Sequence, residues 1–347
     1  MRVVQFIAAS GPGGIEQVAF DYSYSMKKLG IECITIAKLP TQQIKKYDEY
    51  GLKIINNINS SNFFSFISFF KYKKIFSEQN ISVIIDHIGR NIKLTKFISP
   101  KIPVISVTHT YNLKHRIHAD AIISINSKIH SEVSKFYQKK SYLIPNPLSI
   151  NGSPILKYND FFNKKSNDFV IGVMGQHVKH KGYDYFLHSL KILKEKGISF
   201  KCLFAGDGVE RKALENISYK NGLSENVEFI GWVYDKRSFY EKIDLFCLPS
   251  ISEPFGLVVT EAMSFGKPVI ATNTDGPSDI IRHGIDGIIV PSCDQIAFAK
   301  ALEFFISNRS SLMKMGYLAY CRAHNCFSHE KIGKLLYEAF TDLCKFS

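Results

Sequence analysis

The chain has 347 residues, of which 45% are hydrophobic and 22% are charged, and its formal net charge is +13. This length exceeds the size at which one core usually keeps growing, so we expect two globular domains. No apolar run approaches the roughly 18 residues that a membrane-spanning helix needs. Seven scattered cysteines without a C-x-x-C pair favour free thiols in a reducing compartment, so we expect a cytoplasmic protein.

The positive charge is concentrated in the first half of the sequence. Residues 1–150 contain 20 Lys and Arg against 9 Asp and Glu, a net +11, which leaves +2 for residues 151–347. The positive electrostatic potential from this charge favours anionic partners, either nucleic acid or the acidic face of a membrane, and does not distinguish between them.

The first half alternates short apolar runs with helical stretches. Val3–Ala8 leads through the glycine turn Ser10–Gly14 into Ile15–Leu29, which has apolar residues at helical spacing, and no cleavage signature of a signal peptide is present. This alternation predicts a parallel sheet covered on both faces, in a doubly wound domain. The further predicted strands are Cys33–Ala37, Leu52–Ile55, Ile81–Ile85, Val104–Val107 and Ala121–Ile125.

The alternation lapses over residues 145–167 and then restarts, which predicts a linker followed by a second α/β domain. Its predicted strands are Phe169–Met174, Phe200–Phe204, Val227–Ile230, Leu245–Leu248 and Val269–Ala271, with helices over Tyr183–Lys196 and Val209–Asn221. The tail from Asp294 is predicted to be helical, and its last helix to begin near Ser328. The predicted domains are therefore 1–150, 151–326 and a terminal helix over 327–347.

The most informative stretch is Ser250–Gly266, SISEPFGLVVTEAMSFG. A turn at Phe255-Gly256 precedes a predicted helix, whose first amides near Gly256, Leu257 and Val258 lack intrahelical acceptors and form an anion site. Glu253 and Glu261 flank that site, and a carboxylate suits a pair of sugar hydroxyls. The alternative is an amphipathic helix with a charged cap.

Two other strand ends carry polar residues where open α/β sheets place ligands. Lys181 precedes a predicted helix, so its ammonium group and the positive helix end both favour a phosphate. His109 follows the strand Val104–Val107 and could orient a hydroxyl, although a structural histidine explains it equally well. The loop Gly11–Gly14 lacks the full G-x-G-x-x-G spacing, so it gives little support to hydride chemistry and fits a tight turn equally well.

The segment Phe63–Lys74 combines an aromatic stripe with Lys71, Lys73 and Lys74. It is too short and too charged to span a membrane, but a helix that lies in an anionic headgroup layer has this pattern. A core-facing helix with a charged end is the alternative. The sequence contains no D-x-D pair, H-E-x-x-H or G-x-x-x-x-G-K-[ST], so neither a metal nor another cofactor is indicated.

With these motifs in place, the chain resembles the retaining nucleotide-sugar glycosyltransferases of family four. The resemblance is carried by Glu253-Pro254-Phe255-Gly256 through Glu261-Ala262-Met263, by Gly266–Thr272, Ala205–Gly208 and Lys181-Gly182. It is strong over residues 168–290 and thin over the first half. It implies the GT-B architecture, two facing Rossmann-like domains with a C-terminal helix that crosses back to the first domain.

The resemblance also implies a role for each matched residue. Glu261 is expected to hold the donor ribose and Glu253 to face the transferred sugar, while the nucleobase lies near Ile230. The diphosphate is expected at Lys181, at the 256–258 amides and at the Gly13-Gly14 backbone. His109 is expected to touch the sugar from the first domain.

One residue departs from the family pattern, because Gln176 stands where the family usually has an arginine. A bidentate phosphate contact is therefore missing, and His177, His180 or Lys179 are the candidates to replace its charge.

The predicted function is transfer of a hexosyl unit, with retention and without a metal, from a nucleotide diphosphate sugar, with UDP favoured. The expected acceptor is a glycan or glycolipid of the lipopolysaccharide or cell-surface polysaccharide type at the inner face of the cytoplasmic membrane. The alternatives are a nucleotide-sugar epimerase of the same architecture and a basic nucleic-acid-binding protein, for which no motif is present.

Overall fold

A computed structural model describes residues 1–7, 13–56, 66–149, 157 and 168–345. It divides into two compact units, Met1–Ser149 with Cys326–Ser347 (unit 1) and Ile150–Asn325 (unit 2). Most of the predicted linker and part of the glycine turn lie outside the described residues, as do Phe63 and Phe64.

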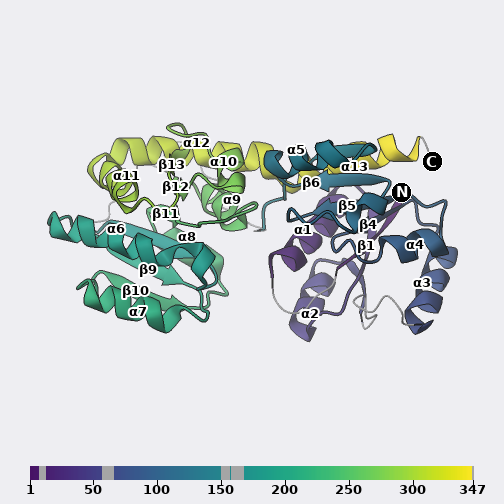
Figure 1. Ribbon diagram of the computed structural model, residues 1–347, viewed down its shortest axis with the longest axis horizontal. Helices are drawn as coiled ribbons and strands as arrows, with labels where there is room; N and C mark the ends of the chain where they lie inside the picture. The colour runs from purple at the N-terminus through teal and green to yellow at the C-terminus, as the bar shows by residue number, and fades with distance from the viewer. Residues whose placement is uncertain (8–12, 57–65, 150–156, 158–167, 346–347) are drawn as a thin grey trace. The chain divides into compact units, whose positions relative to one another are not determined.

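Unit 1 is a seven-stranded parallel sheet in the order β3-β2-β1-β4-β5-β6-β7, with helices on its faces (Figure 1). The strands are β1 (Arg2–Phe6), β2 (Glu32–Ile36), β3 (Lys53–Ile55), β4 (Val83–Asp86), β5 (Val104–Thr108), β6 (Ala121–Ser124) and β7 (Lys140–Leu143). The helices are α1 (Gly14–Lys28), α2 (Thr41–Glu49), α3 (Phe66–Glu78), α4 (Ile92–Ile98), η1 (Arg116–His118), α5 (Ser127–Phe136) and α13 (His329–Cys344). The order reverses between β1 and β4, which makes their carboxyl ends the topological switch point.

Unit 2 is a six-stranded parallel sheet in the order β10-β9-β8-β11-β12-β13. The strands are β8 (Val170–Met174), β9 (Lys201–Ala205), β10 (Val227–Gly231), β11 (Leu245–Leu248), β12 (Val269–Thr272) and β13 (Gly287–Val290). The helices are η3 (Lys179–Lys181), α6 (Tyr183–Glu195), α7 (Arg211–Lys220), α8 (Lys236–Lys242), α9 (Leu257–Ser264), α10 (Asp275–Ile280) and α11 (Gln295–Ser307). Helix α12 (Arg309–Phe327) continues from unit 2 into unit 1. Here the switch point lies between β8 and β11.

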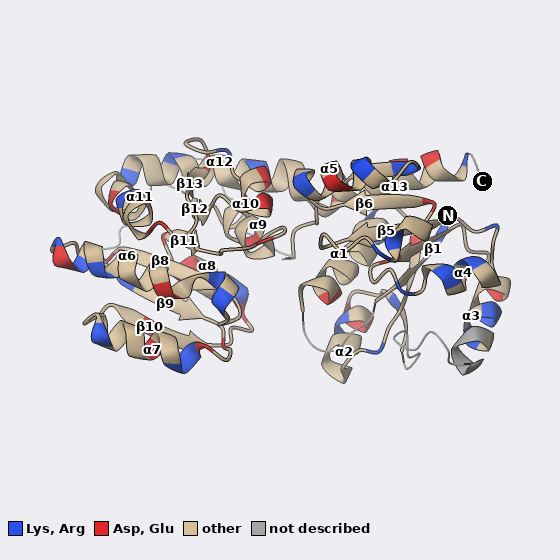
Figure 2. Cartoon of the chain, in the orientation of Figure 1, with Lys and Arg blue, Asp and Glu red and all other residues tan. Residues whose placement is uncertain are grey.

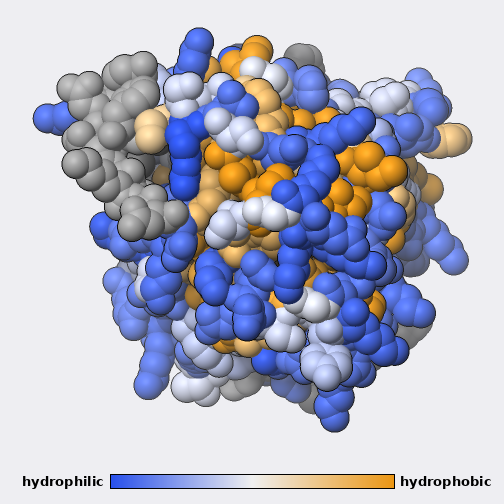
Figure 3. All heavy atoms as spheres, turned by 90° about the vertical axis from the view of Figure 1, so that its left-hand side faces the viewer, coloured by the Kyte–Doolittle hydropathy of each residue, from blue (hydrophilic) through white to orange (hydrophobic). Residues whose placement is uncertain are grey.

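The central strands are hydrophobic on both faces because helices cover both faces of a parallel sheet. Strands β4, β5 and β11 are buried at every position. The side of unit 2 in Figure 3 is mostly hydrophilic, with hydrophobic residues gathered near its middle. No described helix is long and apolar enough to cross a membrane.

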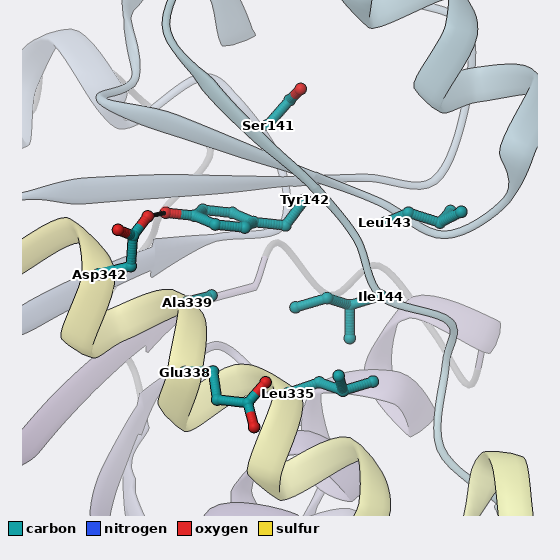
Figure 4. Close-up of a pocket in the computed structure, with 8 residues that line it drawn as sticks. All are labelled: Ser141, Tyr142, Leu143, Ile144, Leu335, Glu338, Ala339 and Asp342. Atoms are coloured by element: carbon teal, nitrogen blue, oxygen red, sulfur yellow. Dashed lines mark hydrogen bonds between the residues drawn. The ribbon is translucent and has the colours of Figure 1, made fainter.

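The last helix, α13, packs on α1 and lies beside β7. Ser328 caps it by accepting a hydrogen bond from the Lys331 amide, and Gly333 lets the helix approach the Ser25 carbonyl, because a Cβ there would lie 2.7 Å from that oxygen. On the β7 side, the Tyr142 hydroxyl donates to Asp342 at 2.6 Å (Figure 4). The C-terminal segment is therefore part of the core of unit 1.

Candidate functional site

The loops that follow β8 and β11 meet at the switch point of unit 2. Gly182 has φ +64°, and a Cβ at this position would lie 2.2 Å from the Pro249 carbonyl oxygen, so only glycine lets the two loops approach this closely. The Ile251 amide also donates to the His180 carbonyl at 2.8 Å. These contacts place Lys181, from the first loop, opposite Glu253, from the second.

Lys181 and Glu253 form an ion pair across this switch point. The Nζ to Oε2 distance is 2.6 Å, and the two side chains are only 18% and 12% exposed. Charges this far removed from water are stabilised by each other, so loss of either one leaves its partner uncompensated. The pair holds an ammonium group at the position where open α/β sheets bind ligands.

Helix α9 begins directly after this pair. Gly256 has φ +93°, a conformation that L side chains rarely adopt, and it turns the chain into the helix. Within the described residues, the amides of Gly256, Leu257 and Val258 have no hydrogen-bond acceptor, whereas the Val259 amide donates to the Gly256 carbonyl at 2.9 Å. Three free amides and the positive end of the helix dipole make an anion site.

Glu261 lies on α9 with 1% of its side chain exposed, and two residues of α8 hold it. Its Oε1 accepts from the Lys236 ammonium at 2.6 Å, and its Oε2 accepts from the Tyr240 hydroxyl at 3.1 Å. Burial, and then the neighbouring Glu261 carboxylate, raise the pKa of Tyr240 and keep the hydroxyl protonated as a donor. The sequence analysis missed Lys236 and Tyr240, although their spacing of four on one helix face, after the N-cap Asp235, is a usable signal.

The ends of β8, β9 and β10 are joined by backbone hydrogen bonds. The Gly206 amide donates to the Gly231 carbonyl at 2.6 Å, and the His177 amide donates to the Asp207 carbonyl at 2.8 Å. Half-buried Ile230 lies at the end of β10, and Gln176 is exposed at the end of β8. These residues line one edge of the sheet next to the Lys181 loop.

The hypothesis that His177 supplies the missing positive charge is wrong. Its side chain is fully buried between the rings of Tyr183 and Phe229, and neither ring nitrogen has a partner among the described residues. Burial lowers the pKa of His177, so the ring is neutral at physiological pH. Lys179 and His180 are exposed and remain the candidates.

Unit 1 contains the other predicted residues. Exposed Gly13 caps α1, which begins at Gly14, and the Glu16 carboxylate lies so close that a Cβ on Gly13 would be 2.7 Å from it. His109 follows β5 and is 8% exposed, with its ring stacked on that of His87 at 5.4 Å between centroids. Burial, and secondarily the Arg116 charge, lower the pKa of His109 to about 3, so this histidine is neutral.

The described residues contain no cluster of three or more His, Cys, Asp or Glu side chains that could hold a metal ion. One pocket, with a cavity volume of about 390 Å³, lies between β7 and α13 (Figure 4). None of the predicted site residues lines this pocket. Its lining residues are Ser141, Tyr142, Leu143, Ile144, Leu335, Glu338, Ala339 and Asp342.

Two Rossmann-like units, of which the second carries a cation and a free helix N-terminus at its switch point, place the protein in the GT-B class of folds. A solved glycosyltransferase from Rickettsia africae matches with a TM-score of 0.82 and 19% identity over 100% of this chain and 99% of that chain. The structure of Anabaena Alr3699/HepE in complex with UDP and glucose matches with a TM-score of 0.80 and 18% identity over 99% and 100%. At these identities the likeness shows the fold.

Sequence comparison identifies the family of the second half of the chain. Residues 156–322 match the model of the family described as Glycosyl transferases group 1, and this part of the chain belongs to that family. The capsular polysaccharide biosynthesis glycosyltransferase CapM of Staphylococcus aureus is 33% identical over 193 residues, which are 55% of this chain and 51% of CapM. The chain spans about half the length of the curated relatives it matches.

Proposed function

We propose that the protein is a retaining glycosyltransferase that moves a hexosyl unit from a nucleotide diphosphate sugar to a hydroxyl group. The observation that carries this proposal is the Lys181–Glu253 ion pair in front of the free amides of α9. A cation and a helix N-terminus at one point attract a diphosphate, and a carboxylate beside them suits sugar hydroxyls.

The chemical role of these groups follows from where charge develops. Departure of the diphosphate from an oxocarbenium-like transition state leaves negative charge on its oxygens. Lys181 and the amides of Gly256, Leu257 and Val258 are fixed before the reaction, so they stabilise that charge better in the transition state than in the ground state. In front-face attack the departing diphosphate takes the acceptor proton, and no separate general base is required.

The nucleoside is proposed to bind between α9 and the end of β10. Glu261 would accept hydrogen bonds from the ribose hydroxyls, because each carboxylate oxygen has a second lone pair beyond those used by Lys236 and Tyr240. Ile230 would contact the base. A UDP-sugar is the favoured donor, in line with the UDP and glucose bound to the structural neighbour Alr3699/HepE.

The acceptor is proposed to be a lipid-linked, lipopolysaccharide or polysaccharide glycan, because the relative CapM is named for capsular polysaccharide biosynthesis and the relative LpsE of Rhizobium meliloti for lipopolysaccharide core biosynthesis. Helix α3 adds a membrane contact: Phe70 is 53% exposed beside exposed Lys71, Lys73 and Lys74, shown as part of the charge pattern in Figure 2. Tyr72 and Phe76 of the same helix are buried, so Phe70 and the three lysines would form the side of α3 that faces an anionic membrane at its cytoplasmic face.

The experiment that tests the proposal is a thermal-shift screen of nucleotides and nucleotide-sugars, followed by turnover of the stabilising donor with membrane extract. We expect a UDP-sugar to stabilise the protein and to be consumed only when an acceptor is present. Conversion of the free UDP-sugar without acceptor would instead identify an epimerase. Stabilisation by no nucleotide would refute both enzyme proposals.

A further inference from the structure

A chain of buried hydrogen bonds leads from His109 into the core of unit 1. His109 Nε2 lies 3.1 Å from His87 Nδ1, and His87 Nε2 lies 3.1 Å from the side-chain oxygen of Gln5. Gln5 is on β1, whereas His87 and His109 directly follow β4 and β5. These hydrogen bonds therefore cross the switch point between β1 and β4 in the sheet of unit 1.

The Gln5 amide determines which atom donates in each of these hydrogen bonds. Its Nε2 lies 2.8 Å from the carbonyl oxygen of Ala19, which can only accept, so the amide nitrogen must face that oxygen and donate. The hydroxyls of Ser23 and Thr35 lie 2.6 and 2.8 Å from the same nitrogen. Oε1 is therefore the atom that faces His87, and because it has no hydrogen to donate, His87 Nε2 must carry one.

His87 then determines the tautomer of His109. Burial, and secondarily the neighbouring His109 and Arg116, lower the pKa of His87 well below its ordinary value, so His87 is neutral and its Nδ1 accepts. The donor in the bond between the two rings is consequently His109 Nε2. Because His109 is also neutral, its Nδ1 carries a lone pair, and among the described residues this atom has no hydrogen-bond partner.

The groups around the two rings support this arrangement. The Arg116 guanidinium, from η1, donates to the carbonyls of Val107 and His87 at 2.6 and 3.2 Å, which holds a positive charge beside the rings. Tyr22 of α1 contacts the edge of His87, and burial raises its pKa, so it stays neutral. The Asp86 carboxylate accepts from the amides of Ile88 and Gly89 instead of from either histidine.

We propose that His87, held by Gln5, is a positioning residue that fixes His109 as the Nε2–H tautomer with Nδ1 as a hydrogen-bond acceptor. His109 thus recognises a ligand group that donates a hydrogen, namely a sugar hydroxyl, and rejects a phosphate oxygen, which has only lone pairs to offer. This inference rests on the proposed function, since the hydroxyl belongs either to the transferred sugar or to the acceptor glycan. The neutral His109 ring thus gives unit 1 a hydrogen-bond acceptor that selects a hydroxyl group and carries no charge.

The tautomer can be measured in the ligand-free protein by nitrogen-15 NMR of histidine-labelled full-length chain. Spectra of His109→Gln and His87→Phe assign the two rings. We expect His109 to show a protonated Nε2 and an unprotonated Nδ1 throughout pH 5.5–8. A protonated Nδ1, a doubly protonated ring or averaging between tautomers would overturn the proposal. This measurement needs no substrate, so it stands or fails independently of the glycosyltransferase activity.

A double-mutant cycle separates positioning from a general structural role. We expect His87→Phe to lower kcat/KM about tenfold, the equivalent of one hydrogen bond of about 1.4 kcal/mol, and to cause no further loss in a His109→Phe background. The control His118→Gln removes an exposed imidazole of η1 and should leave kcat/KM unchanged. Losses that add in the double variant would overturn the proposal.

The same variants show which hydroxyl is recognised. If it belongs to the donor, His87→Phe weakens binding of the nucleotide-sugar about tenfold but not binding of the free nucleotide. If it belongs to the acceptor, donor binding is unchanged and the KM for the acceptor rises by a similar factor. An effect on neither would exclude a hydroxyl contact at His109.

Discussion

Replacement of Lys181 by methionine removes the ammonium group but keeps most of the side-chain volume. Loss of one preorganised group that stabilises a developing anion typically lowers kcat by about 10²–10³, and we expect a loss of that size here. The variant also leaves Glu253, which is 12% exposed, without its cation. Breaking a fully buried pair costs about 3–5 kcal/mol, so for this partly exposed pair we expect about 1–3 kcal/mol.

Two further variants separate the catalytic loss from the stability loss. At about 2–4 °C per kcal/mol for a domain of this size, Lys181→Met should lower the midpoint of thermal unfolding by about 2–12 °C. Adding Glu253→Gln removes the uncompensated charge and should restore much of that midpoint without restoring turnover. Lys212→Met, at an exposed position on α7, is the control and should change neither quantity.

The assay is acceptor-dependent release of the nucleotide, measured together with nucleotide binding by calorimetry. Turnover of Lys181→Met within threefold of the parent protein, with equal nucleotide affinity, would refute the assignment of Lys181 to the diphosphate. An unchanged unfolding midpoint would refute the magnitude derived from the burial of the pair.

Three further predictions follow from other contacts. Glu261→Gln should weaken UDP binding about tenfold in calorimetry, whereas Glu228→Gln, at an exposed position, should not change it. Equal UDP affinities of Glu261→Gln and the parent protein would exclude Glu261 as the ribose ligand. Burial lowers the pKa of His329 to about 4, so the unfolded chain binds a proton that the folded chain does not, and stability should fall by up to about 3 kcal/mol as the pH drops from about 6.5 to 4. His329→Gln should reduce this slope in calorimetric unfolding, and an unchanged slope would contradict the assignment. Replacing Phe70 by serine and the three lysines of α3 by glutamine should weaken binding to anionic vesicles by about 3 kcal/mol, which is more than a hundredfold. The control variant, Lys212→Gln with Lys220→Gln on α7, should bind these vesicles like the parent protein. Equal vesicle binding by the α3 variant would remove the membrane contact from the proposal.

The two-domain α/β fold could be predicted because parallel strands that are covered on both faces read as continuous apolar runs. Val104–Val107 and Leu245–Leu248 are such runs, and the structure has β5 and β11 there. Strand β7 was missed, because Lys140–Leu143 forms a half-exposed edge of the sheet and has no apolar run. The start of the last helix near Ser328 could be predicted, since serine is a favoured residue at the N-terminal cap of a helix.

The candidate site was predicted in part. The resemblance of Glu253 through Met263 to glycosyltransferases is confirmed by the match to Glycosyl transferases group 1, but retention of configuration and the roles of the individual residues stay predictions. Lys236 and the His87–Gln5 chain were missed because their importance depends on packing between elements far apart in the sequence. His177 was misjudged for the same reason, since burial by Tyr183 and Phe229 decides its charge.

The most direct test of the proposed reaction is to incubate the protein with a UDP-sugar and membrane extract and to determine the anomeric configuration of the product. The proposed function predicts acceptor-dependent transfer with the configuration of the donor retained, as the family resemblance implies, and the Lys181–Glu253 site predicts loss of transfer in Lys181→Met. Transfer with inverted configuration, or UDP-sugar consumption that needs no acceptor, would contradict it.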